Sequence, residues 1–270
     1  MLVSDIPSIL QFDLGERLAH CAEAWAVIGA STWVKKVISQ GYRIPFKRSD
    51  PVQTRVPSNP TVDKLSTAWT VLKDEAIDLL KKAAVTVVGF VSGQYILSYF
   101  AVPKARSPGK FRPILNLKKF NKNVKKYHFR METLAMVRDW VQPGAFFCRV
   151  DLKDAFPHIP IHPTFRKCLR FVWLGKLLEW KVLPFGLRCS PRVLTKVVKP
   201  VVAFIWATWG ILLSVYMDDM LLQASTADLA YLQIQIVVLV FMCLGWSINW
   251  EKSNFIPSQT IIHLVSSWTV

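Results

Sequence analysis

The stretch ILLSVYMDDMLLQAS, residues 211–225, places two adjacent aspartates, Asp218 and Asp219, inside an otherwise uncharged apolar run. Neighbouring carboxylates in apolar surroundings repel each other unless a cation or a proton is shared between them. The flanking residues 211–216 and 220–223 predict two short strands, so the aspartates are expected at a hairpin turn. A tight turn can bring both carboxylates to one spot, whereas neighbours inside a regular strand point to opposite faces. An Asp-rich turn on the surface is the alternative that this stretch alone leaves open.

The composition points to a polyanionic partner. The 270 residues include 34 Lys and Arg against 18 Asp and Glu, a net charge of +16 that binding a small acidic metabolite does not require. Such an excess favours nucleic acid first and an anionic membrane surface second. The hydrophobic fraction of 52% is ample for the core of one large or two modest domains.

The cysteines and the first residues indicate a compartment. Five cysteines are spread along the chain with no Cys-x-x-Cys pair, which predicts buried free thiols in a reducing environment. The opening MLVSDIPSILQFDLGERL lacks the basic and apolar segments of a secretory signal. The protein is therefore expected to stay inside the cell, in the cytoplasm or the nucleus.

One apolar run raises the question of a membrane span. Residues 229–250 contain 22 residues without a charge, which is long enough to cross a bilayer. Polar residues interrupt the run and Gly245 divides it. A buried helix followed by a strand is favoured over the membrane span, and no membrane partner is expected.

The N-terminal third predicts helices, a linker and strands. Residues 13–46 predict two helices and a turn, with Gly41 closing the second helix. The Pro-rich PFKRSDPVQTRVPSNP then predicts an extended linker. A helix of mixed charge is expected from Thr61, and a pair of short strands around Gly93.

A basic segment follows, KARSPGKFRPILNLKKFNKNVKK, residues 104–126. Its Lys and Arg residues alternate with apolar ones, which predicts a strand pair whose basic face holds phosphates. A basic hairpin exposed only for solubility is the alternative.

A second acidic position lies in GAFFCRVDLKDAFPHIPIHP. A strand over residues 146–150 is expected to end at Asp151, a suitable place for a reactive carboxylate, although a helix cap would also use Asp. A hairpin around Gly175, a tight turn at LPFGLRCSP and a long helix over residues 190–209 follow.

Taken in order, the segments KFRPILNL, VDLKDAF, LPFGLRCSP, YMDD and LGWSINWEKS form a set that resembles the reverse transcriptase domain of retroelements. The N-terminal ERLAHCAEAWAVIGASTWVKKVISQGYRIPF is similar to the segment before this domain in tyrosine-recombinase retrotransposons of the DIRS group. The resemblance thus extends over nearly all of the chain.

The resemblance implies an α+β right-hand polymerase whose antiparallel palm sheet carries the aspartates, with fingers and a helical N-terminal extension. In the family, a primer-grip hairpin, thumb, connection and RNase H follow the segment KSNFIPSQTIIHL. The thumb and RNase H are therefore expected to be absent here, and the affinity for the primer is expected to be poor. The expected division is N-terminal extension and linker 1–60, fingers 61–127, palm 128–158, fingers 159–189 and palm 190–270.

The implied activity is RNA-directed DNA polymerisation, in which a primer 3′-hydroxyl attacks the α-phosphate of a deoxynucleotide. Two Mg²⁺ ions about 4 Å apart can stabilise the attacking and leaving oxygens, with Mn²⁺ as an alternative. By the resemblance, Asp151 and Asp218 would bridge both ions, the Leu152 carbonyl would be a further ligand, and Asp219 would help to hold the first ion. The implied partners are an RNA or DNA template with its primer and dNTP, and no oligomeric state is implied.

The resemblance also assigns substrate contacts. Phe156 would lie under the sugar and exclude a 2′-hydroxyl, and Lys252 would protonate pyrophosphate, although a surface lysine is the alternative. The triphosphate would be bound by Lys110 and Arg112, with Lys104 as a weaker candidate, and by the backbone amides of Asp154 and Ala155. The nucleotide pocket would be lined by Phe185 and Gly186. The primer would be contacted by Tyr216 and Met217.

The sequence leaves three other interpretations. An RNA virus replicase is disfavoured. Such replicases carry a Ser-Gly motif with a downstream Asn that selects ribose, and LPFGLRCSP stands in its place here. A retroelement-derived nucleic-acid-binding fragment with weak or no turnover is the main alternative. A membrane protein built around residues 229–250 is the third.

Overall fold

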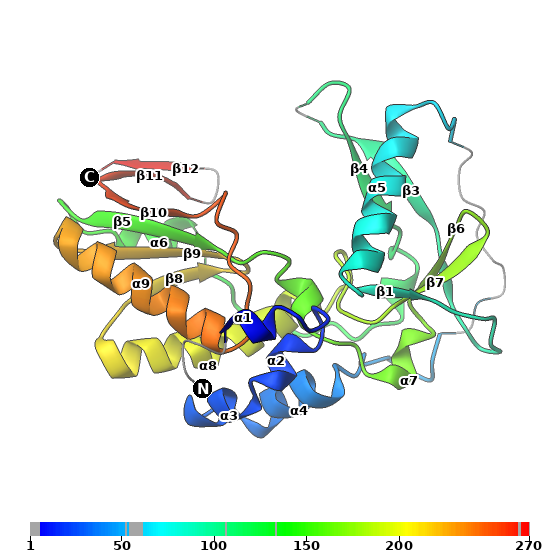
Figure 1. Cartoon of the computed structure of the whole chain (residues 1–270), viewed down its shortest axis with the longest axis horizontal. Helices are drawn as coiled ribbons and strands as arrows, with labels where there is room; N and C mark the ends of the chain where they lie inside the picture. Colours follow the sequence, from blue (N-terminus) through cyan, green and yellow to red (C-terminus); the bar gives the residue numbers. More distant parts are fainter. Residues whose placement is uncertain are drawn as a thin grey trace.

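A computed structural model describes residues 6–51, 53, 62–105, 107–132, 134–263 and 266–269. Two lobes lie side by side, with the N-terminal helices below and between them (Figure 1). We call the lobe that contains β5 and β8 to β12 the palm lobe, and the lobe that contains β1 to β4, β6 and β7 the fingers lobe.

The palm lobe is built on a four-stranded antiparallel sheet with strand order β10-β5-β9-β8. Helices α8 and α9 cover one face, and the short helix α6 packs on the other (Figure 1). The palm elements are β5 (Phe146–Asp151), β8 (Leu213–Tyr216), β9 (Asp219–Ala224), β10 (Asn254–Ser258), the hairpin β11 (Thr260–His263) and β12 (Ser266–Thr269), and helices α6 (Leu134–Trp140), α8 (Ser190–Trp209) and α9 (Ala227–Cys243).

Side-chain alternation decides which way the ends of the palm strands face. Cys148 and Val150 belong to the core under α8 and α9, whereas Phe147 belongs to the cluster with α6. Because successive strand residues point to opposite faces, Asp151 shares the face of Phe147. Asp151 therefore lies on the face that α8 and α9 leave uncovered.

The fingers lobe has a four-stranded sheet of order β1-β7-β6-β2 and a separate hairpin, β3-β4. Helix α5 begins after Ser66, whose hydroxyl accepts from the Trp69 N–H at 3.2 Å and caps the helix. The fingers elements are β1 (Val85–Val87), β2 (Ile96–Leu97), β3 (Tyr99–Pro103), β4 (Phe111–Leu115), β6 (Arg170–Trp173), β7 (Lys176–Trp180), and helices α5 (Thr67–Lys81) and α7 (Pro163–Arg166). Two 3₁₀ turns, η2 (Phe120–Lys122) and η3 (Phe156–His158), lie where the chain passes between the lobes.

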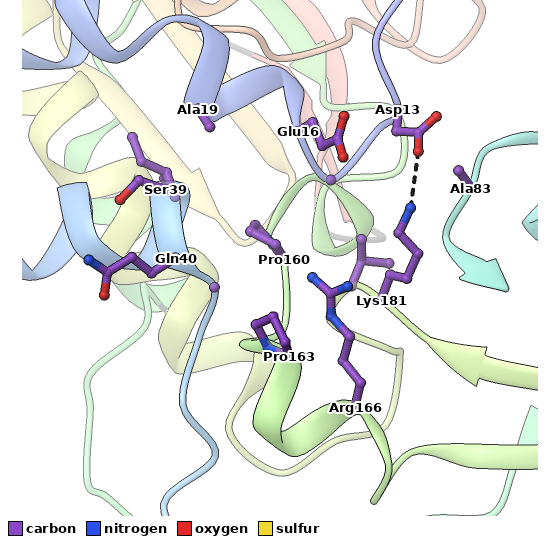
Figure 2. Close-up of a pocket in the computed structure, with 14 residues that line it drawn as sticks. Asp13, Glu16, Ala19, Ser39, Gln40, Ala83, Pro160, Pro163, Arg166 and Lys181 are labelled. Atoms are coloured by element: carbon purple, nitrogen blue, oxygen red, sulfur yellow. Dashed lines mark hydrogen bonds and ion pairs between the residues drawn. The ribbon is translucent and has the colours of Figure 1, made fainter. Parts of the chain in front are cut away.

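The N-terminal helices α1 (Ile6–Ile9), α2 (Arg17–His20), α3 (Ala22–Val27) and α4 (Thr32–Gln40) dock on both lobes. Asp13 pairs with Lys181 Nζ at 3.0 Å, beside a pocket of about 200 Å³ between α2, α4 and the loop of Pro160 and Pro163 (Figure 2). On the palm side, Trp25 Nε1 donates to the Leu244 carbonyl at 3.1 Å.

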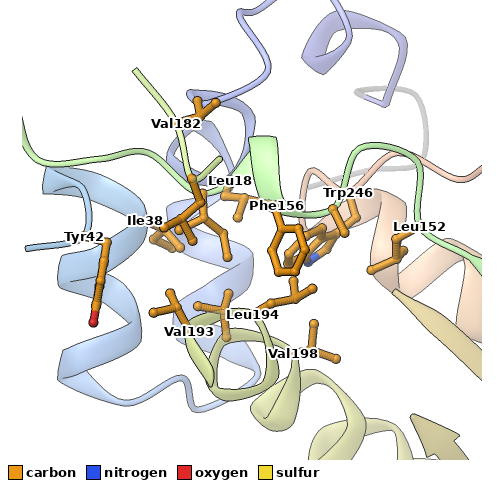
Figure 3. Close-up of a cluster of buried hydrophobic side chains, with 14 of the residues drawn as sticks. Leu18, Ile38, Tyr42, Leu152, Phe156, Val182, Val193, Leu194, Val198 and Trp246 are labelled. Atoms are coloured by element: carbon orange, nitrogen blue, oxygen red, sulfur yellow. The ribbon is translucent and has the colours of Figure 1, made fainter. Parts of the chain in front are cut away.

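One apolar core joins the N-terminal helices to the palm. Leu18 and Ile38 lie near Val193 and Leu194 of α8, with Phe156 and Trp246 in the same cluster (Figure 3). All of these side chains are buried. The palm lobe and the N-terminal helices therefore share one hydrophobic core, so displacing either would expose apolar surface.

Several sequence predictions are confirmed. Strand β5 ends at Asp151, β6 and β7 turn at Gly175, and α8 spans Ser190–Trp209. All five cysteines are free thiols, and four of them are buried. Among the described residues, no helix combines the length and the apolar character needed to cross a membrane.

Other predictions are wrong in detail. Helix α5 begins at Thr67, so residues 62–66 are not helical, and no strand pair forms around Gly93. Instead β2 pairs in parallel with β6, a partner about 70 residues away in the sequence, and β3 forms a local hairpin with β4 around Gly109. The described residues of the basic segment 104–126 contribute one strand, β4, and the strand expected after Gly245 starts only at Asn254. Half of the Pro-rich linker, residues 52 and 54–60, falls outside the described residues.

Gly245 is a position that should not accept a side chain. Its φ is +89°, and an added Cβ would lie 2.7 Å from the Arg17 carbonyl oxygen. We expect Gly245→Ala to lower the free energy of unfolding by about 2 kcal/mol or more. The positive φ is unfavourable for alanine, and the steric overlap of its Cβ with the Arg17 backbone adds to this cost. Urea unfolding checks this, with Gly89→Ala as control because a Cβ at Gly89 meets nothing within 4 Å. Equal unfolding midpoints for the two variants would contradict the expectation.

Candidate active site

The register of the palm strands assembles an acidic cluster. Asp151, the last residue of β5, is the cross-strand partner of Asp219, the first residue of β9. Tyr216 closes the β8–β9 hairpin opposite Asp219, which leaves Met217 and Asp218 as its two loop residues. The predicted hairpin turn is confirmed, and it brings both aspartates of YMDD to the strand end that carries Asp151.

The hairpin loop is held in an unusual conformation. Met217 has a φ of 56°, and of the two loop residues only Met217 is in the positive range, as in a type II′ turn. A bulky residue there is strained unless its surroundings fix it. The Asp218 carbonyl accepts from the Leu152 N–H at 2.9 Å, which ties the loop to the residue after Asp151.

The carboxylates of Asp151 and Asp219 have protein partners. Asp151, only 7% exposed, accepts from Asn249 Nδ2 at 2.9 Å. Its backbone N–H donates to Ser253 Oγ at 3.0 Å. Asp219 accepts from Arg149 Nε at 2.7 Å, a diagonal cross-strand pair on the same face of the sheet.

Asp218 is the carboxylate whose charge is least compensated. Burial raises its pKa first, and the negative charges of Asp151 and Asp219 raise it further, while nearby Lys252 lowers it. Lys252 is exposed in the turn before β10, so its charge is partly screened by solvent. The charge of Lys252 therefore only partly offsets the burial and the neighbouring carboxylates that raise the pKa of Asp218.

The donor set fits a hard divalent cation. Within the described residues, no three His, Cys, Asp or Glu side chains converge as a preformed metal site. Carboxylate and carbonyl oxygens are nevertheless the ligands such ions take, and a cation would offset the burial and the repulsion that raise the pKa of Asp218. Such an ion would draw together the carboxylates of Asp151, Asp218 and Asp219 and the carbonyl of Leu152.

The loop after Asp151 presents free backbone donors. Asp154 has a φ of 53°, and its carboxylate pairs with Lys82 Nζ at 2.9 Å. Within the described part of the chain, neither the Asp154 nor the Ala155 N–H donates to a protein acceptor. Unpaired amides beside a basic side chain are suited to an anion.

An aromatic pair lies next to these amides. Phe156 is buried and meets the exposed Phe185 edge to face, with ring centroids 5.0 Å apart. Asn121 holds the turn of Phe185 by donating to the Gly186 carbonyl and accepting from the Arg188 N–H, both at 2.8 Å. Gly186 has a φ of 84°, which favours glycine there.

The basic candidates lie in the other lobe. Lys110 and Arg112 are exposed at β4 of the fingers hairpin, and the Lys104 N–H donates to the Lys110 carbonyl at 2.9 Å. The palm sheet lies in the other lobe, apart from the β3–β4 hairpin (Figure 1). The structure thus brings Tyr216 and Met217 together with the aspartates at the end of the palm sheet. The basic residues Lys110 and Arg112 lie apart from them in the fingers lobe.

Residues that the sequence analysis missed complete the site. Arg149, Asn249 and Ser253 pair with the acidic strand ends, and Asn249 lies inside the segment LGWSINWEKS without having been singled out. His158 is fully buried in the loop after Asp151. No local pattern predicts these contacts, because each depends on the tertiary register.

The hydrogen bonds of His158 define its tautomer. Nε2 accepts from the Ser247 N–H at 3.1 Å, so Nδ1 carries the proton and donates to the Asp154 carbonyl at 2.9 Å. Burial lowers the pKa of His158 to about 4, opposed by the Asp154 carbonyl and carboxylate and reinforced by the charge of Arg17. The ring is therefore neutral at physiological pH.

Sequence comparisons identify relatives of the chain. A family model described as "Reverse transcriptase (RNA-dependent DNA polymerase)" matches residues 102–264, more than half of the chain. The genome polyprotein of Petunia vein clearing virus (isolate Shepherd) is 30% identical over 122 residues, which cover 44% of this chain and 5% of the polyprotein. The Gag-Pol polyprotein of Bovine immunodeficiency virus (strain R29) is 25% identical over 166 residues, 58% of this chain and 11% of the polyprotein. The chain thus spans a small part of these relatives.

Solved structures share the fold. A prototype foamy virus protease-reverse transcriptase superposes with a TM-score of 0.69 at 21% identity, over 84% of this chain and 29% of that chain. The foamy viral protease-reverse transcriptase in complex with dsDNA gives 0.67 at 22% identity, over 100% of this chain and 55% of that chain. The expected α+β palm and fingers architecture is confirmed.

The buried His158 predicts a pH-dependent stability. Its folded pKa of about 4 lies below the ordinary 6.5, so the unfolded chain binds the proton more readily. Its contribution is complete above pH 6.5 and is lost as the pH falls towards 4, which should lower the free energy of unfolding by about 3 kcal/mol.

The measurement is urea unfolding between pH 4 and pH 7.5 for wild type, His158→Gln and, as control, His128→Gln at an exposed histidine. His158→Gln should flatten the pH profile and His128→Gln should not. A His158→Gln profile with the wild-type slope would show that this ring is not the source.

Proposed function

The chain belongs to the reverse transcriptase family, and we propose on that basis that it polymerises DNA on an RNA or DNA template from a primer and dNTP. The observation that carries the proposal is the cross-strand pairing of Asp151 with Asp219, with the half-buried Asp218 beside them. The foamy viral protease-reverse transcriptase that shares this fold is found in complex with dsDNA, which supports nucleic acid as the partner.

The proposed roles of the acidic residues follow from their chemistry. Bound Mg²⁺ or Mn²⁺ would supply positive charge for the attacking and leaving oxygens. Asp151 and Asp218 would hold the metal with the Leu152 carbonyl, and Asp219 would assist from its pair with Arg149. Lys252, close enough to Asp218 to lower its pKa, would give a proton to the leaving pyrophosphate.

The proposed substrate contacts use both lobes. Lys110 and Arg112, with Lys104, would grip the triphosphate from the fingers, and the free amides of Asp154 and Ala155 would receive it on the palm. Phe185 and Gly186 would line the nucleotide pocket, and Tyr216 and Met217 would contact the primer end.

The finer assignments are proposals on sequence grounds. We assign the chain to the DIRS group because of its N-terminal segment, and we retain the division at residues 60, 127, 158 and 189 into extension, fingers and palm segments. An intracellular location, cytoplasmic or nuclear, is proposed from the opening sequence and the free cysteines.

Primer extension on poly-rA/oligo-dT with labelled dTTP tests the activity. We expect Mg²⁺-dependent incorporation by wild type and a loss of at least about a thousandfold in Asp151→Asn and Asp218→Asn, since several kcal/mol of charge stabilisation disappear. Asp139→Asn is the matched control, because Asp139 is exposed and pairs only locally with Arg138.

A thermal unfolding titration with Mg²⁺ gives a second readout. Mg²⁺ should raise the midpoint of wild type and of Asp139→Asn, but not that of Asp218→Asn, because binding to the folded state stabilises it. Nucleic-acid binding without incorporation in any metal would refute polymerisation and leave the binding-only alternative.

Phe156 should select the sugar. Phe156→Val removes a ring whose edge-to-face packing on Phe185 fixes its position, and opens space for a 2′-hydroxyl. We expect the preference for dTTP over UTP, measured as the ratio of kcat/KM values, to fall at least about tenfold. Phe90→Val, at an exposed phenylalanine, should leave the ratio unchanged. A ratio in Phe156→Val equal to wild type would rule out the steric role.

A further inference from the structure

The N-terminal helices contact the turn that precedes β10. The Gly245 backbone packs so closely on the Arg17 backbone that a Cβ would lie 2.7 Å from the Arg17 carbonyl oxygen. Trp25 Nε1 donates to the Leu244 carbonyl one residue earlier. The turn of residues 244–247 is therefore anchored to α2 and α3 by both shape and hydrogen bonding.

Arg17 reaches from α2 to the end of this turn. Its Nη1 donates to Ser247 Oγ at 2.8 Å. Its Nε and Nη2 donate to the carbonyls of Phe12 and Leu10, each at 3.1 Å. Because three bonds in different directions fix a planar guanidinium, Ser247 is held at a defined place.

Ser247 in turn contacts the loop after Asp151. The Lys153 N–H donates to the Ser247 carbonyl at 2.9 Å, and the Ser247 N–H donates to His158 Nε2 at 3.1 Å. His158 then donates from Nδ1 to the Asp154 carbonyl at 2.9 Å, with Trp246 against its ring. The chain of contacts thus runs from Arg17 through Ser247 and His158 to Asp154.

Asp154 needs such support. Its φ of 53° is a left-handed conformation that a non-glycine residue keeps only when its surroundings hold it. The pair with Lys82 fixes the carboxylate of Asp154, whereas His158 fixes its peptide carbonyl. The orientation of that peptide sets the direction of the adjoining Ala155 N–H, because a peptide unit is planar.

We propose that Arg17 of the N-terminal extension is a positioning residue that acts through Ser247 and His158 on the Asp154 carbonyl, and so aims the Ala155 N–H at the nucleotide triphosphate. The inference rests on the proposed function, because it takes this amide as a nucleotide contact. The N-terminal extension is then part of the nucleotide site without touching the nucleotide.

Steady-state primer extension with Arg17→Gln, Arg17→Lys and Ser247→Ala tests the nucleotide role. We expect the KM for dTTP to rise about tenfold in Arg17→Gln and Ser247→Ala, with kcat within about twofold of wild type. Arg17→Lys should show a smaller rise in KM than Arg17→Gln, because lysine can donate a single hydrogen bond to Ser247. The double variant Arg17→Gln with Ser247→Ala should raise KM no more than either single variant does. The matched control is Arg43→Gln, since Arg43 also reaches from the N-terminal extension but contacts the half-buried His162.

Hydrogen exchange gives a readout that does not need activity. Exchange at the Lys153 and His158 amides should speed up at least about fivefold in Arg17→Gln and Ser247→Ala, while α4 keeps its wild-type protection. Loss of protection in α4 of Arg17→Gln would mean general loosening, and Ser247→Ala, which removes only a hydroxyl, then decides.

The two failures are distinguishable. A polymerising wild type whose Arg17→Gln and Ser247→Ala variants match Arg43→Gln in both KM and exchange overturns the inference. A wild type that does not polymerise refutes the proposed function, and the exchange rates at residues 153–158 alone then support or overturn the bracing of Asp154.

Discussion

Repulsion between carboxylates at one end of the palm sheet is the constraint around which this region is organised. The register of β5 and β9 sets Asp151 opposite Asp219, and the hairpin adds Asp218 to the same edge. Neighbouring like charges in partly desolvated surroundings are unfavourable, and the raised pKa of Asp218 expresses this. The fold must therefore hold these residues together against their own electrostatics.

Strand pairing, hydrogen bonds and core packing hold the three aspartates together. Strand pairing fixes the backbones, Arg149 and Asn249 engage two of the carboxylates, and the Leu152 N–H holds the Asp218 carbonyl. The underside of the sheet packs on α8 and α9, and the same core continues into the N-terminal helices (Figure 3). Side chains that project from strand ends over a close-packed core have little freedom to move apart, so their repulsion is not relieved by movement of the side chains.

The sequence predicted the parts of this arrangement that depend on local patterns. The apolar run around Asp218 and Asp219 has the length of a hairpin, and residues 190–209 have the periodicity of a helix, so both are found where expected. The strands β1 and β2, with three and two residues, carry too little pattern to be recognised and exist because β7 and β6 provide partners. Likewise Arg149 meets Asp219 only through a cross-strand diagonal, and Arg17 meets Ser247 across 230 residues of sequence. Contacts of this kind follow from register and docking, which a single sequence does not specify.

The distribution of charge between the lobes gives the two halves a reason to cooperate. The acidic cluster belongs to the palm, whereas the exposed cations Lys110 and Arg112 belong to the fingers hairpin, and the chain as a whole carries +16. Charges of opposite sign that lie in separate lobes do not pair directly, and salt screens their attraction across the solvent between them. A phosphate-bearing ligand with its counter-cations offers negative charge to the fingers and positive charge to the palm at once. The same ligand would thereby reduce the repulsion among the aspartates and the excess positive charge of the hairpin, so its binding would couple the lobes through electrostatics that neither lobe can satisfy alone.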